Sequence, residues 1–96
     1  MTAYIVFTRT AMLDPAEMAI YGEMAPAAAA GHDATLLALY GRFEVLEGDP
    51  VEGAVMISFP TFDEAKAWYH SPAYQAAVQH RFAGSRYNVV IIDGVA

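Results

Sequence analysis

Residues 68–82 (WYHSPAYQAAVQHRF) hold most of the side chains in this sequence that could take part in chemistry. Tyr74 and Arg81 are seven residues apart, so a helix would place them on nearly the same face. A planar guanidinium and a phenol on one face can bind a carboxylate or an enolate. In the structural alternative, Tyr74 packs with its hydroxyl at the rim. Arg81 then caps a helix end or pairs with an internal acid such as Glu44 or Asp93.

Three histidines, His32, His70 and His80, could include a general base. His70 and His80 lie ten residues apart across Ser71-Pro72, and no histidine or carboxylate spacing is typical of a metal site. No histidine is clearly placed as an axial ligand for haem. We therefore interpret them as surface or loop residues, with His80 facing solvent, and predict no metal site.

The Ser71-Pro72 pair interrupts what otherwise reads as one helix. Ser71 could in principle be a nucleophile, but its place before a proline is typical of a helix N-cap. The pair thus predicts a new helix that runs to about Phe82. Tyr74, Val78 and Phe82 recur at i, i+4 and i+8, so we expect this stripe to face the protein interior.

Length and composition restrict the remaining choices. The chain has 96 residues, which is one domain, and a net charge of −6 that disfavours nucleic acid and anionic membrane surfaces as partners. No apolar run approaches the ~20 residues of a membrane span. The N-terminal MTAYIVFTRT is unlike a signal peptide, and cysteine is absent, which fits a reducing cytoplasm. We expect a cytoplasmic protein.

The expected elements follow from alternation and capping signals. They are a strand at 3–9, a helix at 14–31, one long or two short strands within 34–49, a strand at 54–59, a helix from Thr61 that breaks at Ser71-Pro72, and a strand at 86–94. This β-α-β-β-α-β order predicts an α+β, ferredoxin-like domain over residues 1–96. Its sheet should be four-stranded and antiparallel, with the second helix broken in two.

The first helix carries its own signals. Asp14 and Pro15 begin it, and Pro26 should kink or restart it before Gly31 ends it. The spacing of its apolar residues predicts that Met18, Tyr21 and Ala25 face the sheet.

Both faces of the expected sheet are apolar. One set of alternating residues is Ile5, Phe7, Val55, Ile57, Phe59, Val89 and Ile91, and the opposite set is Tyr4, Val6, Ala54, Met56, Ser58, Val90 and Ile92. Helices cover only one face in this fold, so the other face should be polar if it met water. Monomers tolerate exposed apolar patches of only about a few hundred Å². The pattern therefore predicts a homodimer that packs sheet against sheet.

The segments EVLEGD, FPTFDEAKAWYHSPAYQAAVQHR and VVIIDG resemble domain-of-unknown-function family thirteen-thirty over nearly the whole chain. The resemblance implies a dimeric α+β barrel, a fold shared with cofactor-free monooxygenases, chlorite-dismutase-like haem proteins and muconolactone-isomerase-like enzymes. It implies no established activity. Trp68, Tyr69, Ser71, Tyr74 and Arg81 fall on the positions of the family motif.

One departure from the family pattern concerns ligand charge. Many members carry Arg-Gly-Gly in the middle of the second strand, where this chain has Leu39-Tyr40-Gly41. If that arginine binds a ligand in other members, its absence here argues against an anionic ligand.

Two functional hypotheses remain open. In the first, the protein binds or converts a small molecule in a cleft between sheet and helices, the usual site in this superfamily by analogy. The candidate ligand-binding residues are Trp68, Tyr74, Arg81, Tyr40 and Ser71. In the second, the protein is a non-catalytic dimeric module whose cleft is filled by its own side chains, with Trp68 as part of the core. No dinucleotide fingerprint or phosphate loop is present, so no cofactor is predicted.

Overall fold

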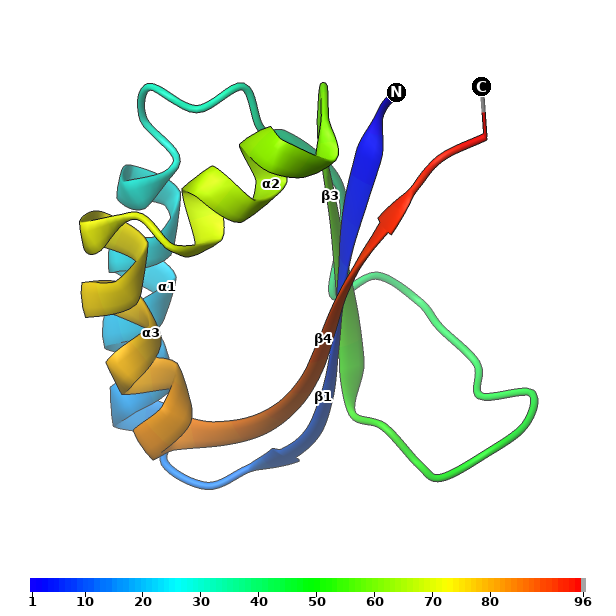
Figure 1. Ribbon diagram of the computed structural model, residues 1–96. Coiled ribbons are helices and arrows are strands. Elements are labelled where there is room, and N and C mark those ends of the chain that lie inside the picture. The colour runs from blue at the N-terminus through cyan, green and yellow to red at the C-terminus, as the bar shows by residue number, and fades with distance from the viewer. Residues whose placement is uncertain (96) are drawn as a thin grey trace.

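The computed structural model describes residues 1–95 and contains a four-stranded antiparallel sheet with helices on one face (Figure 1). The elements are β1 (Ala3–Met12), α1 (Pro15–Ala28), β2 (Thr35–Leu39), β3 (Gly53–Phe59), α2 (Phe62–Tyr69), α3 (Pro72–Gly84) and β4 (Ser85–Asp93). The strand order is β2-β3-β1-β4, with each neighbouring pair antiparallel. The predicted ferredoxin-like α+β fold and its broken second helix are confirmed.

The break in the second helix has a local cause at Ser71. Its hydroxyl accepts a hydrogen bond from the Tyr74 backbone N–H at 3.2 Å and donates one to the Trp68 carbonyl at 2.7 Å. Ser71 is therefore the N-cap of α3, and Pro72 occupies the first turn, where its missing N–H costs no helical hydrogen bond. A cap of this kind contributes about 1 kcal/mol to helix stability.

Helix α1 starts as its sequence predicts and ends earlier. The Asp14 carboxylate accepts a hydrogen bond from the Ala16 N–H at 3.0 Å. The helix continues through Pro26, which lies in its last turn, and ends at Ala28 instead of reaching Gly31. Gly31 adopts the left-handed conformation, with φ of 82°, in the turn that follows.

The second strand is much shorter than one reading of the sequence allowed. β2 ends at Leu39, and residues 40–52 form an irregular loop, so the predicted long strand or strand pair across 34–49 is wrong. Tyr40 has a φ of 49°, in the left-handed region, which turns the chain out of the strand. The loop projects from the sheet on the side away from the helices (Figure 1).

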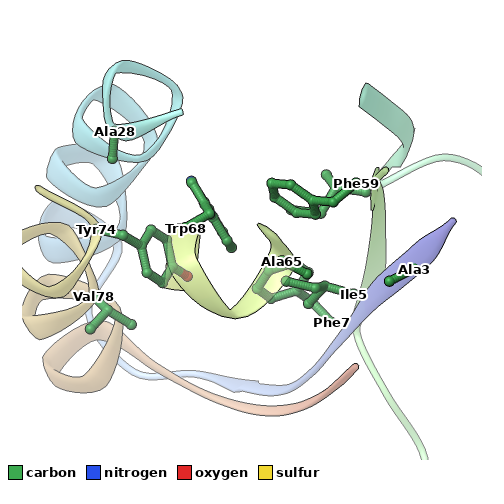
Figure 2. Packing of buried hydrophobic residues seen from close by; sticks show 10 residues of the cluster. Ala3, Ile5, Phe7, Ala28, Phe59, Ala65, Trp68, Tyr74 and Val78 are labelled. Carbon is green, nitrogen blue, oxygen red and sulfur yellow. The ribbon is translucent and has the colours of Figure 1, made fainter. Parts of the chain in front are cut away.

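The core lies between the helices and one sheet face. Ile5, Phe7 and Phe59 from the sheet pack with Trp68 of α2 and Tyr74 of α3. Figure 2 shows Trp68 between Phe59 and Tyr74, with ring centroids 5.5 and 4.0 Å away respectively. These aromatic contacts anchor both halves of the broken helix to the same core.

The buried stripe of α3 differs from the predicted one at its last member. Phe82 is 55% exposed, whereas Arg81 is only 4% exposed. The buried positions are Tyr74, Ala77, Val78, Arg81 and Gly84, which recur every three or four residues. The prediction that Phe82 faces the interior is wrong because Arg81 takes the interior position in that turn.

Helix α1 packs chiefly against α3, and a close approach at Gly84 fixes it there. The Gly84 carbonyl accepts hydrogen bonds from Leu13 N at 2.8 Å and Asp14 N at 2.9 Å. A Cβ added at Gly84 would lie 3.0 Å from backbone and side-chain atoms at the start of α1. Farther along, His80 Nδ1 contacts Glu17 Oε2 at 2.6 Å. α1 is thus tied to α3, and a space remains between α1 and the sheet.

Candidate functional site

A cleft of about 700 Å³ lies between α1 and the helix-side face of the sheet. Its walls are mostly apolar and come from both layers: Met18, Ala25 and Pro26 from α1 with Ala29 just after it, Leu36 and Leu39 from β2, and Phe7, Val55 and Ile57 from the central strands. Leu36 pairs with Ile57 and Leu39 with Val55, so these β2 side chains share the helix-side face. They remain about half exposed because they face the cleft and no helix covers them.

One end of the cleft is polar, and the sheet register explains why. Gly53, Arg9 and Tyr87 lie opposite one another in a single row across β3, β1 and β4. Gly53 has no side chain, so the Tyr40 ring occupies that space: a Cβ at Gly53 would lie 2.8 Å from Tyr40 Cδ1. The Tyr40 hydroxyl reaches across the row and hydrogen-bonds the Tyr87 hydroxyl.

Arg9 is held within this row by contacts on two sides. Its Cζ lies 5.1 Å from the centroid of the Tyr40 ring, a cation–π distance. Its Nε lies 3.3 Å from Glu52 Oε1, an ion-pair distance, although the geometry does not make a hydrogen bond. The charge of Arg9 is therefore partly balanced by a carboxylate that stands outside the cleft lining.

Arg81 brings a second guanidinium to the same end. Its Cζ lies 5.1 Å from the ring centroid of Tyr87, 5.9 Å from that of Tyr21 and 6.0 Å from that of Phe7. All three rings line the cleft. The guanidinium therefore lies among the aromatic side chains that form this part of the wall.

The Arg81 charge has no acidic partner within residues 1–95. Glu44 lies in the exposed loop and Asp93 at the far end of β4, so the alternative in which Arg81 pairs with one of these acids does not hold. The Nε atom is buried without a hydrogen-bond partner in the described part of the chain. This side chain therefore holds a buried positive charge that no carboxylate of the described chain offsets.

The phenols of this region are protonated donors and acceptors. The Tyr21 and Tyr74 hydroxyls share a hydrogen bond of 2.7 Å. Burial raises the pKa of Tyr21, with the Tyr74 phenol adding to the effect, and burial also raises the pKa of Tyr74. Burial and the hydrogen bond to Tyr87 raise the pKa of Tyr40. These groups therefore stay neutral near pH 7 and do not act as bases.

Trp68 adds a further donor without an acceptor. Its ring is buried against Tyr74 and contributes to the cleft wall. Its indole Nε1 is buried with no hydrogen-bond partner among the described residues. An indole N–H can only donate, so this atom, like the Arg81 Nε, lacks an acceptor.

The structure brings together four of the five residues proposed from the sequence. Trp68 and Tyr40 line the cleft, Arg81 lies among its aromatic rings, and Tyr74 lies behind Trp68 and Tyr21. Ser71 lies apart from the cleft lining, and both of its hydrogen bonds are used in capping α3. We therefore leave Ser71 out of the candidate site.

The histidines lie away from the cleft lining. His80 contacts Glu17, contrary to the expectation that it faces solvent, and His32 follows α1 in a turn. His70 ends α2 and lines a separate hollow of about 430 Å³ with Lys66. Within residues 1–95, no group of three or more histidine or acidic side chains is placed to hold a metal ion. In the same range, no helix is long and apolar enough to cross a membrane.

Two residues of the polar end, Arg9 and Tyr87, were absent from the sequence-based set. Alternation places both on the buried face of the sheet, although only strand register brings them together. Arg9 continues the buried series Ile5 and Phe7 along β1, and Tyr87 precedes Val89 on the same face of β4. A charged residue in register with buried apolar ones indicates a site or an ion pair.

The fold and the cleft define a small ferredoxin-like α+β protein with an amphipathic pocket between its sheet and its helices. The chain belongs to the family described as Domain of unknown function (DUF1330), whose model matches residues 2–95. A comparison with curated proteins gave no match.

Several solved structures are similar to this chain. A protein of unknown function from Rhodopseudomonas palustris (RPA0582) has a TM-score of 0.74 and 17% identity, over 99% of this chain and 83% of that one. A dimeric protein of unknown function with a ferredoxin-like fold from Bacteroides fragilis has a TM-score of 0.68 and 14% identity, covering 97% and 96%. SnoaB, a cofactor-independent oxygenase from Streptomyces nogalater, has a TM-score of 0.58 and 19% identity, covering 99% and 92%. At these identities the likeness shows the fold alone.

Proposed function

We propose that this protein binds a small, mainly apolar molecule in the cleft between α1 and the sheet. The observation that supports the proposal is the open cleft, which has a volume of about 700 Å³ and is lined by apolar side chains from both layers. Ligand pockets typically measure about 300–1,000 Å³ and combine apolar walls with a few placed polar groups. The open volume argues against the alternative of a module whose cleft is filled by its own side chains.

The lining favours binding over acid–base catalysis. Among the cleft-lining residues within 1–95, none is an aspartate, a glutamate or a histidine. The phenols at the polar end keep their protons because burial raises the pKa of Tyr21 and Tyr40. A general base needs a pKa near the working pH, and no lining side chain offers one.

A thermal-shift screen of small aromatic and keto-acid compounds tests this proposal. Gly22 lines the cleft, and a Cβ added there would meet no heavy atom within 4 Å, so Gly22→Phe can enter the cleft without a clash at its base. The matched control is Ala27→Phe on the exposed side of α1. We expect ligand-dependent rises in melting temperature for the wild type and for Ala27→Phe, and none for Gly22→Phe.

Two results would count against a binding cleft. One is a screen in which no compound raises the melting temperature in a concentration-dependent way. The other is a set of shifts that Gly22→Phe and Ala27→Phe retain equally, because binding would then lie elsewhere on the chain.

We further propose that the protein is a cytoplasmic homodimer joined through the open face of the sheet. Val90 and Ile92 on that face are each 58% exposed, and Leu46 on the projecting loop is 85% exposed. Met56 pairs with Val6 on the same face, so it does not lie under the helices. The Bacteroides fragilis protein of the same fold is described as dimeric. Sedimentation should give twice the chain mass of 10.4 kDa, and a concentration-independent monomer would remove this proposal.

A further inference from the structure

We infer that the ligand of the cleft is an organic anion whose carboxylate or enolate oxygen lies at the arginine–tyrosine end, with its apolar body toward β2. This inference rests on the proposed function, because it names the chemical class that the same cleft accepts. It rests on the two arginines at that end of the cleft and on the lack of an acceptor for the buried Arg81 Nε.

The first observation is the buried positive charge of Arg81. This guanidinium is 4% exposed, has no acidic partner within residues 1–95, and lies within 6.0 Å of the ring centroids of Phe7, Tyr21 and Tyr87, which line the cleft. A buried charge needs an opposite charge or several acceptors to offset its lost hydration. The cation–π contacts supply only part of that offset.

An unsatisfied donor of the same guanidinium points to the same class of ligand. The Nε of Arg81 is buried without an acceptor in the described chain. An arginine side chain can only donate hydrogen bonds, so a partner for this atom must supply lone pairs. A carboxylate offers two oxygens and pairs with guanidinium groups through short, charge-assisted bonds.

The charge of the cleft is opposite to that of the molecule. The chain carries a net charge of −6, yet Arg9 is the charged residue of the lining and Arg81 stands behind its rings. A local positive site within an acidic protein disfavours cationic ligands at the site itself and anionic ones elsewhere on the surface. The anion is thus directed to one place.

The end of β2 carries no positive charge in this chain. Tyr40 follows β2, and its ring packs over Gly53 beside Arg9. In this chain the positive charge comes from β1 and α3, so an anionic ligand does not require an arginine on β2.

The polarity of the cleft also orients the ligand. The polar row of Arg9, Tyr87 and Tyr40 occupies one end, while Leu36 and Ile57 lie two rows of the same sheet face away, toward the other end. An aromatic or branched aliphatic body fits the apolar end, where burial of its carbons is favourable. The acceptor group then faces the arginines.

The test compares two probes of nearly equal shape, para-tert-butylbenzoate and the neutral para-tert-butylbenzamide. Binding is followed by the emission of Trp68, the single tryptophan of the chain, and by calorimetry. We expect the wild type to bind the benzoate at least tenfold more tightly than the benzamide. Arg81→Met should bring the two affinities together, because methionine keeps the buried stem and removes the charge.

The matched control is Arg86→Met, which removes an exposed arginine of β4 and so makes the same change in net charge. It should keep the wild-type preference for the benzoate. If Arg81→Met fails to fold, the ratio of benzoate to benzamide affinity in the wild type and in Arg86→Met still tests whether the cleft prefers an anion. Equal binding of both probes by the wild type overturns this inference and leaves the proposed function intact, as does a preference that survives in folded Arg81→Met. If the cleft binds neither of these probes and no compound of the screen, both this inference and the proposed function are overturned.

Discussion

The two faces of the sheet are both apolar in sequence, but they differ in what covers them. The helix-side face carries the core and, at its β2 edge, an open cleft with two arginines at one end. The opposite face carries Val90, Ile92 and Met56, with no helix over it (Figure 1). Hydrophobicity alone therefore does not assign a function to either face.

The difference between the faces is the presence of buried polar groups. A face that only has to meet another copy of itself needs apolar area, which the open face supplies. A face that has to recognise a small molecule also needs directed donors, which Arg81 and Trp68 supply on the helix side. On this ground we propose subunit contact for the open face and ligand binding for the helix-side cleft.

The largest expected effect on stability comes from truncating an isoleucine to alanine on each of the two faces. Ile5 is fully buried on the helix side, and Ile5→Ala should lower the free energy of unfolding by about 2–5 kcal/mol at any protein concentration. Ile92→Ala is the same truncation on the open face. Its cost should be smaller and should shrink as the protein is diluted below the dimer Kd. If denaturant titrations gave equal losses of unfolding free energy for the two variants, independent of protein concentration, the open face would not be a subunit contact.

A charge on the open face should separate the subunits. Val90→Glu combined with Ile92→Glu should weaken dimerisation at least a hundredfold, or about 2.8 kcal/mol, because an unpaired carboxylate would be buried between the sheets. Ala73→Glu with Ala76→Glu, on the exposed side of α3, adds equal charge and should leave the dimer intact. Sedimentation gives the masses, and circular dichroism confirms folding. A dimer that survives the strand variants would place the interface elsewhere.

The smallest effect concerns the phenols at the cleft. The folded-state pKa of Tyr74 lies above its ordinary value of 10.0 because of burial. Deprotonation therefore favours the unfolded chain. The contribution of the neutral Tyr74 phenol to the free energy of unfolding is fully present below pH 10 and is lost as pH rises through the folded-state pKa. The loss should reach up to about 1.4 kcal/mol per pH unit per buried phenol. Denaturant titrations at a series of pH values across this range should show that the free energy of unfolding falls less steeply with pH in Tyr74→Phe than in the wild type. An unchanged dependence on pH would contradict a buried Tyr74 hydroxyl.

The sequence specified the order of the elements well, and the reason is local. The N-caps at Asp14, Thr61 and Ser71 each satisfy a backbone N–H near the start of the helix that follows. Such signals act within a few residues and do not depend on tertiary contacts. The end of β2 was harder to place, because the apolar pattern continues into residues 43–46 while the chain leaves the sheet at Tyr40.

The candidate site was only half visible for a different reason. Tyr74 and Arg81 share one helix, so their spacing revealed them. Arg9 and Tyr87 join them through strand register, which depends on pairings between segments far apart in the chain. The space that admits Tyr40 exists because Gly53 lies opposite Arg9, a pairing that no local pattern encodes.

The most direct test of the division between the two faces is a nuclear magnetic resonance titration of the isotope-labelled protein with para-tert-butylbenzoate. We expect saturable shifts centred on Arg81, Tyr21 and Tyr87, with Val90 and Ile92 unchanged. Shifts centred on Val90, Ile92 and Met56, with the cleft residues unmoved, would contradict it.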